Sequence, residues 1–176
     1  MAFEKGVFST NSAMSNGELT IAGIKATTLT KEFGSPLFVL DENDFRNRAA
    51  SWKAALLKHF EANAGEVYYA AKSFVCVEVA KMVAESGIGI DVCTGGELAV
   101  VQAANFPGER IELHGNNKSE AEIKAAIDYG VKTIVLDSLQ EIERVARIAT
   151  ASKKIQRVMI RLTPGVEAHT HESIKT

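Results

Sequence analysis

From residue 67 onward, short apolar runs alternate with longer amphipathic runs, and this alternation limits the possible folds more than any other feature of the sequence. The apolar runs predict strands at residues 67–71, 88–92, 110–114, 133–136 and 156–162. The intervening runs have helical periodicity and predict helices at residues 76–86, 96–104, 120–129 and 139–151. Because repeated strand–helix–strand units form parallel sheets with right-handed crossovers, we expect an α/β fold.

One polar residue stands at or near the carboxyl end of each predicted strand. These residues are Lys72, Asp91, His114, Asp137 and Arg161, separated by 19, 23, 23 and 24 positions. Nearly constant spacing favours a barrel of equivalent units, and barrels of this kind place active sites at strand carboxyl ends, so we expect all five side chains at one mouth. A closed barrel needs eight strands. The sequence therefore predicts a partial TIM (β/α)8 barrel with about five units, and indicates part of a longer protein.

The first 66 residues lack this regular alternation. They predict a flexible arm at residues 9–16, a short edge strand at 17–24, a strand at 37–40 and a helix from about 44 to 60. We place a boundary after residue 35, with residues 1–35 as an N-terminal arm with edge strands and residues 36–176 as the first part of the barrel.

Capping residues mark several predicted helix ends. Asp41 or Asn43 is the expected N-cap of the helix near residue 44. Two Ser-x-x-Glu pairs predict capping boxes, and two glycines stand where helix C-terminal glycines are expected. These are Ser119 with Glu122, Ser138 with Glu141, and Gly87 and Gly130.

Composition excludes several classes of function. The 176 residues are 46% hydrophobic and 24% charged, which is ordinary for a soluble globular protein. The net charge is −2 without a basic stripe, so we expect no nucleic-acid partner. No apolar run has the length of a membrane span and the N-terminus lacks a signal pattern, so we expect no membrane contact. Cys76 and Cys93 form no disulfide framework; both are expected to be buried, and the protein to be cytoplasmic.

Lys72 ends an apolar run, which is an unusual place for a lysine. In a partly dry pocket its amine becomes a nucleophile able to form a Schiff base, whereas at a strand end it can also be an ordinary surface charge. Asp91 either orients a cationic group or caps the next helix. Glu97, in the first turn of that helix, either joins the site or only complements the helix dipole.

The remaining polar candidates lie farther along the chain. Residues 114–118 either line a polar pocket or form a Gly/Asn turn. Arg161 lies within an apolar run, so we expect it to be buried and paired with Asp91, Asp137 or an anionic ligand. Glu167, His169, His171 and Glu172 form a cluster whose histidine spacing suits a metal only on an extended segment, and we expect no metal site.

Several motifs resemble a known family. Tyr69-Ala70-Ala71-Lys72 resembles the lysine motif of the fold-type III pyridoxal-phosphate enzymes, which include alanine racemase and eukaryotic ornithine decarboxylase. The runs at 91–98, 114–118 and 161–172 resemble those of diaminopimelate decarboxylases, in particular the actinobacterial ones. The resemblance covers roughly residues 20–176. It implies an alanine racemase-like barrel, with the N-terminal arm joined to a β-domain that these residues do not contain.

The resemblance also implies roles for individual residues. Lys72 would bind pyridoxal 5′-phosphate through a Schiff base, with Ala70 and Asp91 beside the cofactor and Arg161 supporting the pocket. His114 and Asn116 would form part of its wall. The implied enzyme is a cytoplasmic, homodimeric carbon–carbon lyase that converts the amino acid meso-2,6-diaminopimelate to L-lysine and CO₂, the last step of lysine biosynthesis.

Alternatives remain open at this point. A decarboxylase of another basic amino acid, an amino-acid racemase, and a regulatory barrel that binds pyridoxal phosphate without turnover all retain the lysine. The family's phosphate-binding and ring-binding segments have no counterpart in these residues, so we expect the chain alone to have little activity. An unclosed barrel exposes two sheet edges, so we also expect it to self-associate or to recruit its missing half.

Overall fold

The computed structural model describes residues 7–61, 65–162 and 165. The chain divides into two compact units, Met1–Val67 and Tyr68–Thr176. Within the described residues, no helix combines the length and apolar character needed to cross a bilayer. The expected membership of residues 1–35 in a separate β-domain stays a prediction.

The first unit begins with a small antiparallel sheet and two helices. Its elements are β1 (Ser12–Ser15), β2 (Glu18–Ile21), β3 (Ile24–Lys25), α1 (Ala26–Phe33) and α2 (Glu42–His59), with the sheet order β1-β2-β3. Asn16 and Gly17 connect β1 to β2 with φ values of 52° and 77°. Positive φ at both central residues is the geometry of a tight hairpin turn, for which Asn-Gly is strongly preferred. The prediction of a flexible arm at residues 9–16 was therefore wrong.

Two other predictions for this unit can be compared with the structure. The predicted strand at residues 17–24 is confirmed as β2, but a turn at Ala22 and Gly23 separates it from β3. No strand forms at residues 37–40, where Phe38 is 99% exposed. An apolar run becomes a strand only where a neighbouring strand supplies ladder hydrogen bonds, and no ladder includes these residues.

The N-terminus of α2 is fixed by buried carboxylates. Asp41 is the N-cap, as predicted, and its Oδ1 accepts a hydrogen bond from the Asp44 backbone N–H at 3.1 Å. Asp44 in turn accepts from the Thr10 hydroxyl at 2.6 Å, and Asp41 accepts from the Asn11 amide at 3.0 Å. These contacts attach the segment before β1 to α2.

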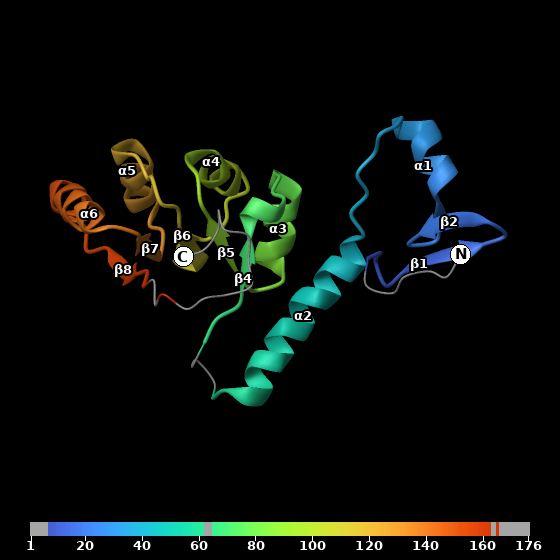
Figure 1. The fold of residues 1–176 in the computed structure, drawn as a ribbon, viewed down its shortest axis with the longest axis horizontal. Helices are drawn as coiled ribbons and strands as arrows, with labels where there is room; N and C mark the ends of the chain where they lie inside the picture. The colour runs from blue at the N-terminus through green and yellow to red at the C-terminus, as the bar shows by residue number, and fades with distance from the viewer. Residues whose placement is uncertain (1–6, 62–64, 163–164, 166–176) are drawn as a thin grey trace. The chain divides into compact units, whose positions relative to one another are not determined.

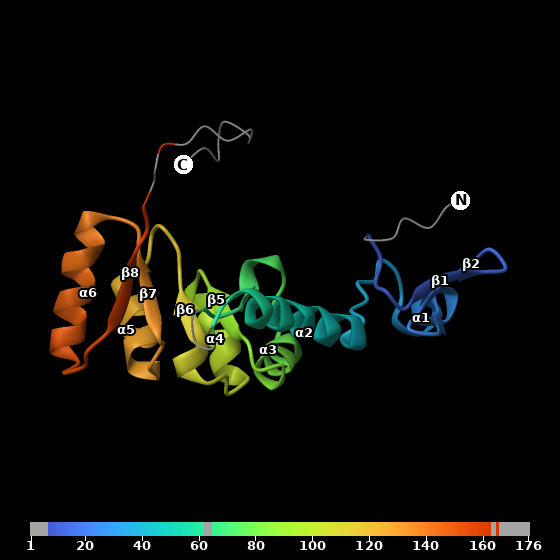
Figure 2. The same cartoon turned by 90° about the horizontal axis from the view of Figure 1, so that it is seen from below.

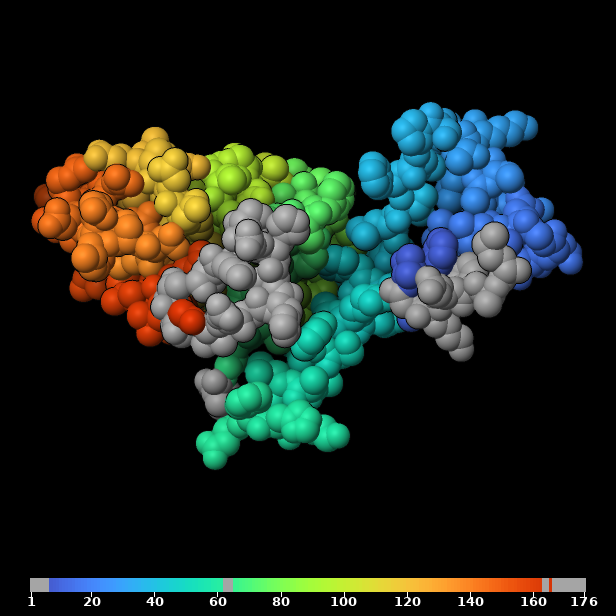
Figure 3. All heavy atoms as spheres, in the orientation of Figure 1, coloured from blue at the N-terminus to red at the C-terminus, as the bar shows by residue number. Residues whose placement is uncertain are grey.

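The second unit is the predicted run of strand–helix units. Its strands are β4 (Tyr68–Ala70), β5 (Gly89–Val92), β6 (Ile111–Leu113), β7 (Thr133–Leu136) and β8 (Arg157–Ile160). They form one parallel sheet in the order β4-β5-β6-β7-β8. The connecting helices are α3 (Val77–Glu85), α4 (Gly95–Ala103), α5 (Glu120–Tyr129) and α6 (Leu139–Ala151). Figures 1 and 2 show these four helices on one face of the sheet. Within this second unit, Figure 3 shows the successive strand–helix repeats side by side in chain order.

Alternating strand residues separate the hydrophobic core from the polar face of the sheet. The core-facing strand residues are 0–1% exposed and pack with the helices; they are Ile90, Val92, Ile111, Leu113 and Ile134. The residues between them share the opposite face. Strand register places one row across this face, made of Ala70, Asp91, Glu112, Thr133 and Arg157. This is the face that lines a barrel interior, and the α/β prediction of a partial barrel is confirmed.

The predicted helix caps are confirmed with one exception. Ser119 and Glu122 form a reciprocal capping box, and Gly130 ends α5 in the left-handed conformation. Gly87 follows α3 with φ 68°. Ser138 accepts from the Glu141 backbone N–H, but the Glu141 carboxylate does not return to Ser138; it binds elsewhere, as described below.

Replacing Gly89 by alanine is expected to destabilise the sheet. A Cβ at this position would lie 2.5 Å from Tyr68 Cε1 and 2.9 Å from the Arg110 backbone oxygen, so β4 or the start of β6 must shift. Overpacking of this kind costs about 1–3 kcal/mol, measurable by urea denaturation. The control is Gly96→Ala, where the new Cβ meets only Thr94 Oγ1 at 3.8 Å. Equal stability of the two variants would contradict the expectation.

Candidate functional site

Lys72 stands in a single 3₁₀ turn, Ala71–Ser73, directly after β4. Local hydrogen bonds hold the turn: the Ser73 hydroxyl donates to the Ala70 carbonyl at 2.7 Å, and the Tyr69 hydroxyl donates to the Phe74 carbonyl at 2.6 Å. The Lys72 residue is exposed. The turn therefore presents a solvent-accessible primary amine at the carboxyl edge of the sheet.

Asp91 lies on β5 beside β4, with its Cα in register with that of Ala70. Among the described residues, its Oδ1 atom is a buried polar atom without a hydrogen-bond partner. Burial raises the pKa of the Asp91 carboxyl, and the charges of Glu112 and Glu97 raise it further. The charges of His114 and Lys72 lower the same pKa. A buried acceptor without a partner is unusual in a folded protein and marks a place where a ligand can bind.

Glu112 is a member of this group that the sequence analysis missed. Its Cα is in register with that of Asp91, and its side chain is 13% exposed. His114 joins the two carboxylates, with Nε2 3.4 Å from Glu112 Oε2 and 3.7 Å from Asp91 Oδ1. Counting two positions back from His114 along β6 identifies Glu112 as a residue on the same face, so strand alternation could have found it.

Asp137 and Arg161 form a second polar group, at the ends of β7 and β8. Arg161 Nη1 donates to Asp137 Oδ1 at 3.1 Å, and the Arg161 backbone N–H donates to the Leu136 carbonyl at 2.9 Å. Of the three predicted partners of Arg161, the structure shows Asp137. The predicted burial was wrong, because the Arg161 side chain is 49% exposed; β8 has a neighbouring strand on one side only within the described sheet.

The loop after β6 carries the last two predicted wall residues, His114 and Asn116. The His114 backbone N–H donates to the Val92 carbonyl at 2.8 Å, which ties the loop to β5. Gly115 has φ +105°, and a Cβ there would lie 2.8 Å from the Cys93 carbonyl oxygen, so only glycine fits. Asn116 is exposed. The predicted positions thus lie at the carboxyl edge of the sheet, with Ala70, Lys72, Asp91 and His114 in one group and Arg161 in the other.

Comparison with known proteins identifies the family. Residues 42–176 match the pyridoxal binding domain of the pyridoxal-dependent decarboxylases. This chain belongs to the pyridoxal-dependent decarboxylase family. The resemblance inferred from the sequence motifs is therefore confirmed, and the cofactor of the family is pyridoxal phosphate.

Several proteins similar to this chain are diaminopimelate decarboxylases. Diaminopimelate decarboxylase of Mycobacterium tuberculosis is 54% identical over 160 residues, which are 91% of this chain and 35% of the relative. The Mycobacterium leprae enzyme is 55% identical over 161 residues, covering 91% and 33%. The crystal structure of diaminopimelate decarboxylase from M. jannaschii has a TM-score of 0.81 at 27% identity, covering 95% of this chain and 39% of that one. The chain spans about a third of the length of these relatives.

The residues present fit the lysine side of a pyridoxal phosphate site. Lys72 offers an accessible amine, Asp91 offers a buried acceptor without a partner, and Ala70 places only a methyl group beside Asp91. These are properties that a flat aldehyde cofactor needs from a pyridoxal-dependent decarboxylase: a covalent anchor, a polar contact and a small side chain beside that contact.

Glu97 and the two cysteines agree better with structural roles. Glu97 Oε2 accepts a hydrogen bond from the Cys93 backbone N–H at 2.6 Å, which satisfies a donor at the N-terminus of α4. Cys76 and Cys93 are half-buried rather than fully buried, and burial raises the pKa of the Cys93 thiol. Among the described residues, no three His, Cys, Asp or Glu side chains are arranged so that they could hold a metal ion, and the Glu167–Glu172 cluster lies outside the described residues.

Replacing Asp91 by asparagine is expected to change the pH dependence of stability. The folded-state pKa of Asp91 is raised, so its ionisation disfavours the folded state as pH rises above about 3.9, the ordinary value for aspartate. Relative to the parent chain, Asp91→Asn should gain stability between pH 4 and 7 and lose that advantage below about pH 4. Thermal melts across this range measure the difference.

Asp128→Asn is the control with the opposite sign. A hydrogen bond from Lys124 lowers the pKa of Asp128, so ionised Asp128 favours the folded state and its replacement should not stabilise the chain above pH 4. A gain for Asp91→Asn that does not vary with pH would contradict the assignment of a raised pKa to Asp91.

Proposed function

We propose that this chain supplies the lysine side of the pyridoxal phosphate site in an enzyme that decarboxylates meso-2,6-diaminopimelate to L-lysine and CO₂. The observation that carries the proposal is the exposed Lys72 at the carboxyl edge of the sheet, together with the buried Oδ1 of Asp91, which has no hydrogen-bond partner among the described residues. The identity of 54–55% to two mycobacterial diaminopimelate decarboxylases supports the choice of substrate. Bound pyridoxal phosphate supplies the electron sink that loss of an α-carboxylate requires.

Lys72 is proposed as the catalytic residue, because it is an exposed primary amine at this edge and a primary amine forms a Schiff base with an aldehyde carbonyl. The amine must release a proton to react. Asp91 Oδ1 is proposed to hold that proton, since burial already favours the protonated form of this carboxyl. The same atom can then return the proton when the amine is protonated again.

The other predicted residues are proposed to bind and orient. Arg161 uses one nitrogen of its guanidinium for Asp137 and is half-exposed, so further N–H donors can bind an anionic oxygen. Ala70 leaves room for a planar ring next to Asp91. His114 and Asn116 are proposed to form the wall on the side of β6, where His114 Nε2 lies 3.7 Å from Asp91 Oδ1 and 3.4 Å from Glu112 Oε2.

A decarboxylase of another basic amino acid is the second candidate. A lysine/ornithine decarboxylase from Vibrio vulnificus, solved in complex with putrescine, has a TM-score of 0.65 at 25% identity. The much higher sequence identity to the mycobacterial relatives favours diaminopimelate. We further propose that the complete gene product is a cytoplasmic homodimer, as the sequence resemblance implies.

The test is CO₂ release by the complete gene product that contains this sequence, supplied with pyridoxal phosphate. We expect release from meso-diaminopimelate and at least roughly a hundredfold lower kcat/KM for ornithine, arginine and lysine. These three lack the second carboxylate of diaminopimelate, and a site that binds a polar group of its substrate strongly rejects substrates without that group. Faster release from ornithine or lysine would favour the second candidate. No release from any amino acid would contradict both.

A further inference from the structure

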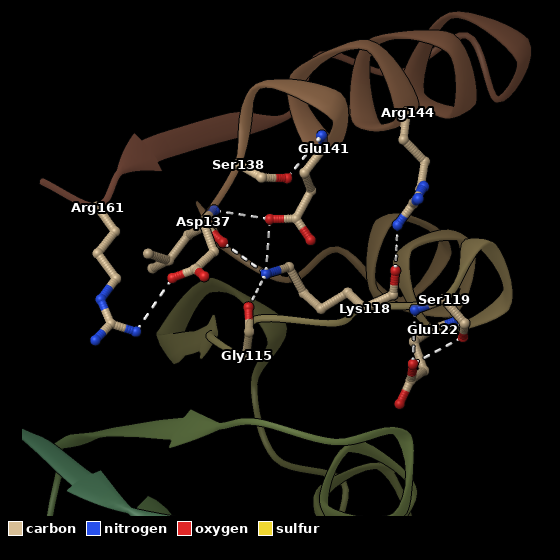
Figure 4. Close-up of polar contacts among 10 residues, drawn as sticks. Gly115, Lys118, Ser119, Glu122, Asp137, Ser138, Glu141, Arg144 and Arg161 are labelled. Carbon is tan, nitrogen blue, oxygen red and sulfur yellow. Dashed lines mark hydrogen bonds and ion pairs between the residues drawn. The ribbon is translucent and has the colours of Figure 1, made fainter. Parts of the chain in front are cut away.

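Lys118 and Glu141 form a buried ion pair between the loop after β6 and the first turn of α6. Lys118, at the end of the loop after β6, and Glu141, in the first turn of α6, are 2% and 3% exposed. Lys118 Nζ lies 3.0 Å from Glu141 Oε2. Figure 4 shows the two side chains pointing toward each other between the loop and the helix. Neither residue has a role in the function proposed above.

Each member of the pair also holds the backbone of a segment at the carboxyl edge of the sheet. Lys118 Nζ donates to the carbonyl oxygens of Gly115 and Val135, the latter at 2.7 Å. Glu141 Oε2 accepts from the Asp137 backbone N–H at 2.9 Å. The pair therefore connects the loop after β6, the end of β7 and the start of α6 through four polar contacts (Figure 4).

The connected segments carry proposed site residues. Gly115 follows His114 directly, and Asp137 binds the Arg161 guanidinium through Oδ1. The segment is held from a second side as well, because Arg144 of α6 donates to the Lys118 carbonyl oxygen at 2.8 Å. A shift of the Asp137 backbone would thus move the Arg161 guanidinium, while a shift of Gly115 would move His114.

A buried ion pair is a poor source of net stability, since well-packed apolar residues of similar volume often stabilise a core equally well. The pair instead fixes the positions of backbone segments, because its hydrogen bonds go to the backbone of Gly115, Val135 and Asp137. We propose that Lys118 and Glu141 are positioning residues that hold the Asp137–Arg161 pair, and secondarily His114, in the geometry that receives the cofactor. This inference rests on the proposed function.

The test replaces the pair by apolar residues of similar size, Lys118→Met with Glu141→Leu, in the complete gene product. We expect the dissociation constant for pyridoxal phosphate, measured by titration, to rise about tenfold or more, as when residues that orient binding groups are removed from metal sites. In an Arg161→Met background, the same replacement should raise it by less than about twofold, because residues acting through one another are not additive. Equal effects in both backgrounds would overturn the inference.

A second readout does not depend on the cofactor. Amide hydrogen exchange at Asp137 and Arg161 should accelerate in the double replacement, because the Asp137 N–H loses its acceptor. Glu141→Gln keeps a carbonyl oxygen at that place and should retain both the slow exchange and most of the cofactor affinity. If the double replacement fails to fold, the cofactor affinity and amide exchange of Glu141→Gln are compared with those of Glu141→Leu alone. Equal cofactor affinity for Gln and Leu at position 141 would contradict a positioning role.

The matched control is the ion pair of Glu120 and Arg147, which joins α5 to α6 and in which both side chains are 60% exposed. Replacing it by Gln and Met should change neither cofactor affinity nor exchange at Asp137. If the unmodified protein itself binds no pyridoxal phosphate, the proposed function fails. The exchange rates at Asp137 then still decide whether the pair holds this segment.

Discussion

Replacement of Glu141 alone by leucine is expected to lower the free energy of unfolding of the second unit by roughly 3–5 kcal/mol. Lys118 would remain as a buried ammonium without its counter-charge, and its stem is enclosed, with 1% of the side chain exposed. The Asp137 N–H would lose its acceptor in the same variant, which adds the desolvation penalty of an unpaired donor. Urea denaturation followed by circular dichroism measures the loss.

Glu120→Leu is the control for that experiment. Glu120 also lies in the first turn of a helix and also forms an ion pair, in its case with Arg147, but both side chains are 60% exposed. Exposed pairs contribute about 0–1 kcal/mol, so this variant should unfold close to the parent chain. A loss below about 1 kcal/mol for Glu141→Leu would mean that the Lys118 ammonium reaches water or another partner, in contradiction to its observed burial.

Replacement of Lys72 by alanine is expected to lower kcat/KM for decarboxylation by roughly a thousandfold or more, because loss of a residue that reacts covalently usually removes most of an enzyme's rate enhancement. Stability should change little, since Lys72 is exposed in a turn whose hydrogen bonds come from Ser73 and Tyr69. Steady-state CO₂ release by the complete gene product and thermal melting separate these two effects.

Lys81→Ala is the matched control for Lys72→Ala. Lys81 is an exposed lysine of α3 that pairs with Glu78 at 2.7 Å, outside the carboxyl edge of the sheet. Its replacement should leave kcat/KM within about twofold, as expected for a surface substitution. A Lys72→Ala variant that retained more than a tenth of the parent rate would show that another amine anchors the cofactor.

The second unit could be predicted well because its strands and helices are each determined by residues close together in the sequence. Each strand is a short apolar run, each helix has its own cap, and parallel connections leave little freedom of topology. The carboxyl ends of the strands, with Lys72, Asp91, His114, Asp137 and Arg161, could therefore be placed before the structure was known. The need to neutralise an arginine within an apolar run predicted Asp91, Asp137 or an anionic ligand as the partner of Arg161, and the structure shows Asp137.

The N-terminal unit was predicted less well for two different reasons. Asn16-Gly17 is a strong hairpin signal, but it overlaps residues 9–16, whose polar composition is also typical of a flexible arm. The run at residues 37–40 has the composition of a strand, but strand formation depends on a partner that local sequence does not specify.

Long-range contacts explain the site residues that sequence reasoning missed. Lys118 was placed only as a member of a polar loop, because its partners Val135 and Glu141 are 17 and 23 positions away. The Ser138–Glu141 spacing suggested a capping box, yet the Glu141 carboxylate binds Asp137 and Lys118 instead. A local motif suggests one hydrogen-bond partner for a carboxylate. The fold brings other donors close to it, and these determine which partner the carboxylate binds.

The most direct test of the central claim is to map where pyridoxal phosphate attaches. The chain is incubated with the cofactor, reduced with borohydride, digested and analysed by mass spectrometry. We expect label predominantly on Lys72, which is exposed at the carboxyl edge of the sheet, and none on Lys118, whose side chain is 1% exposed. Asp91→Asn should reduce the label on Lys72 without redistributing it. Label spread evenly over the exposed lysines, with Lys72 no more modified than Lys81, would contradict the claim that this edge of the sheet forms a cofactor site.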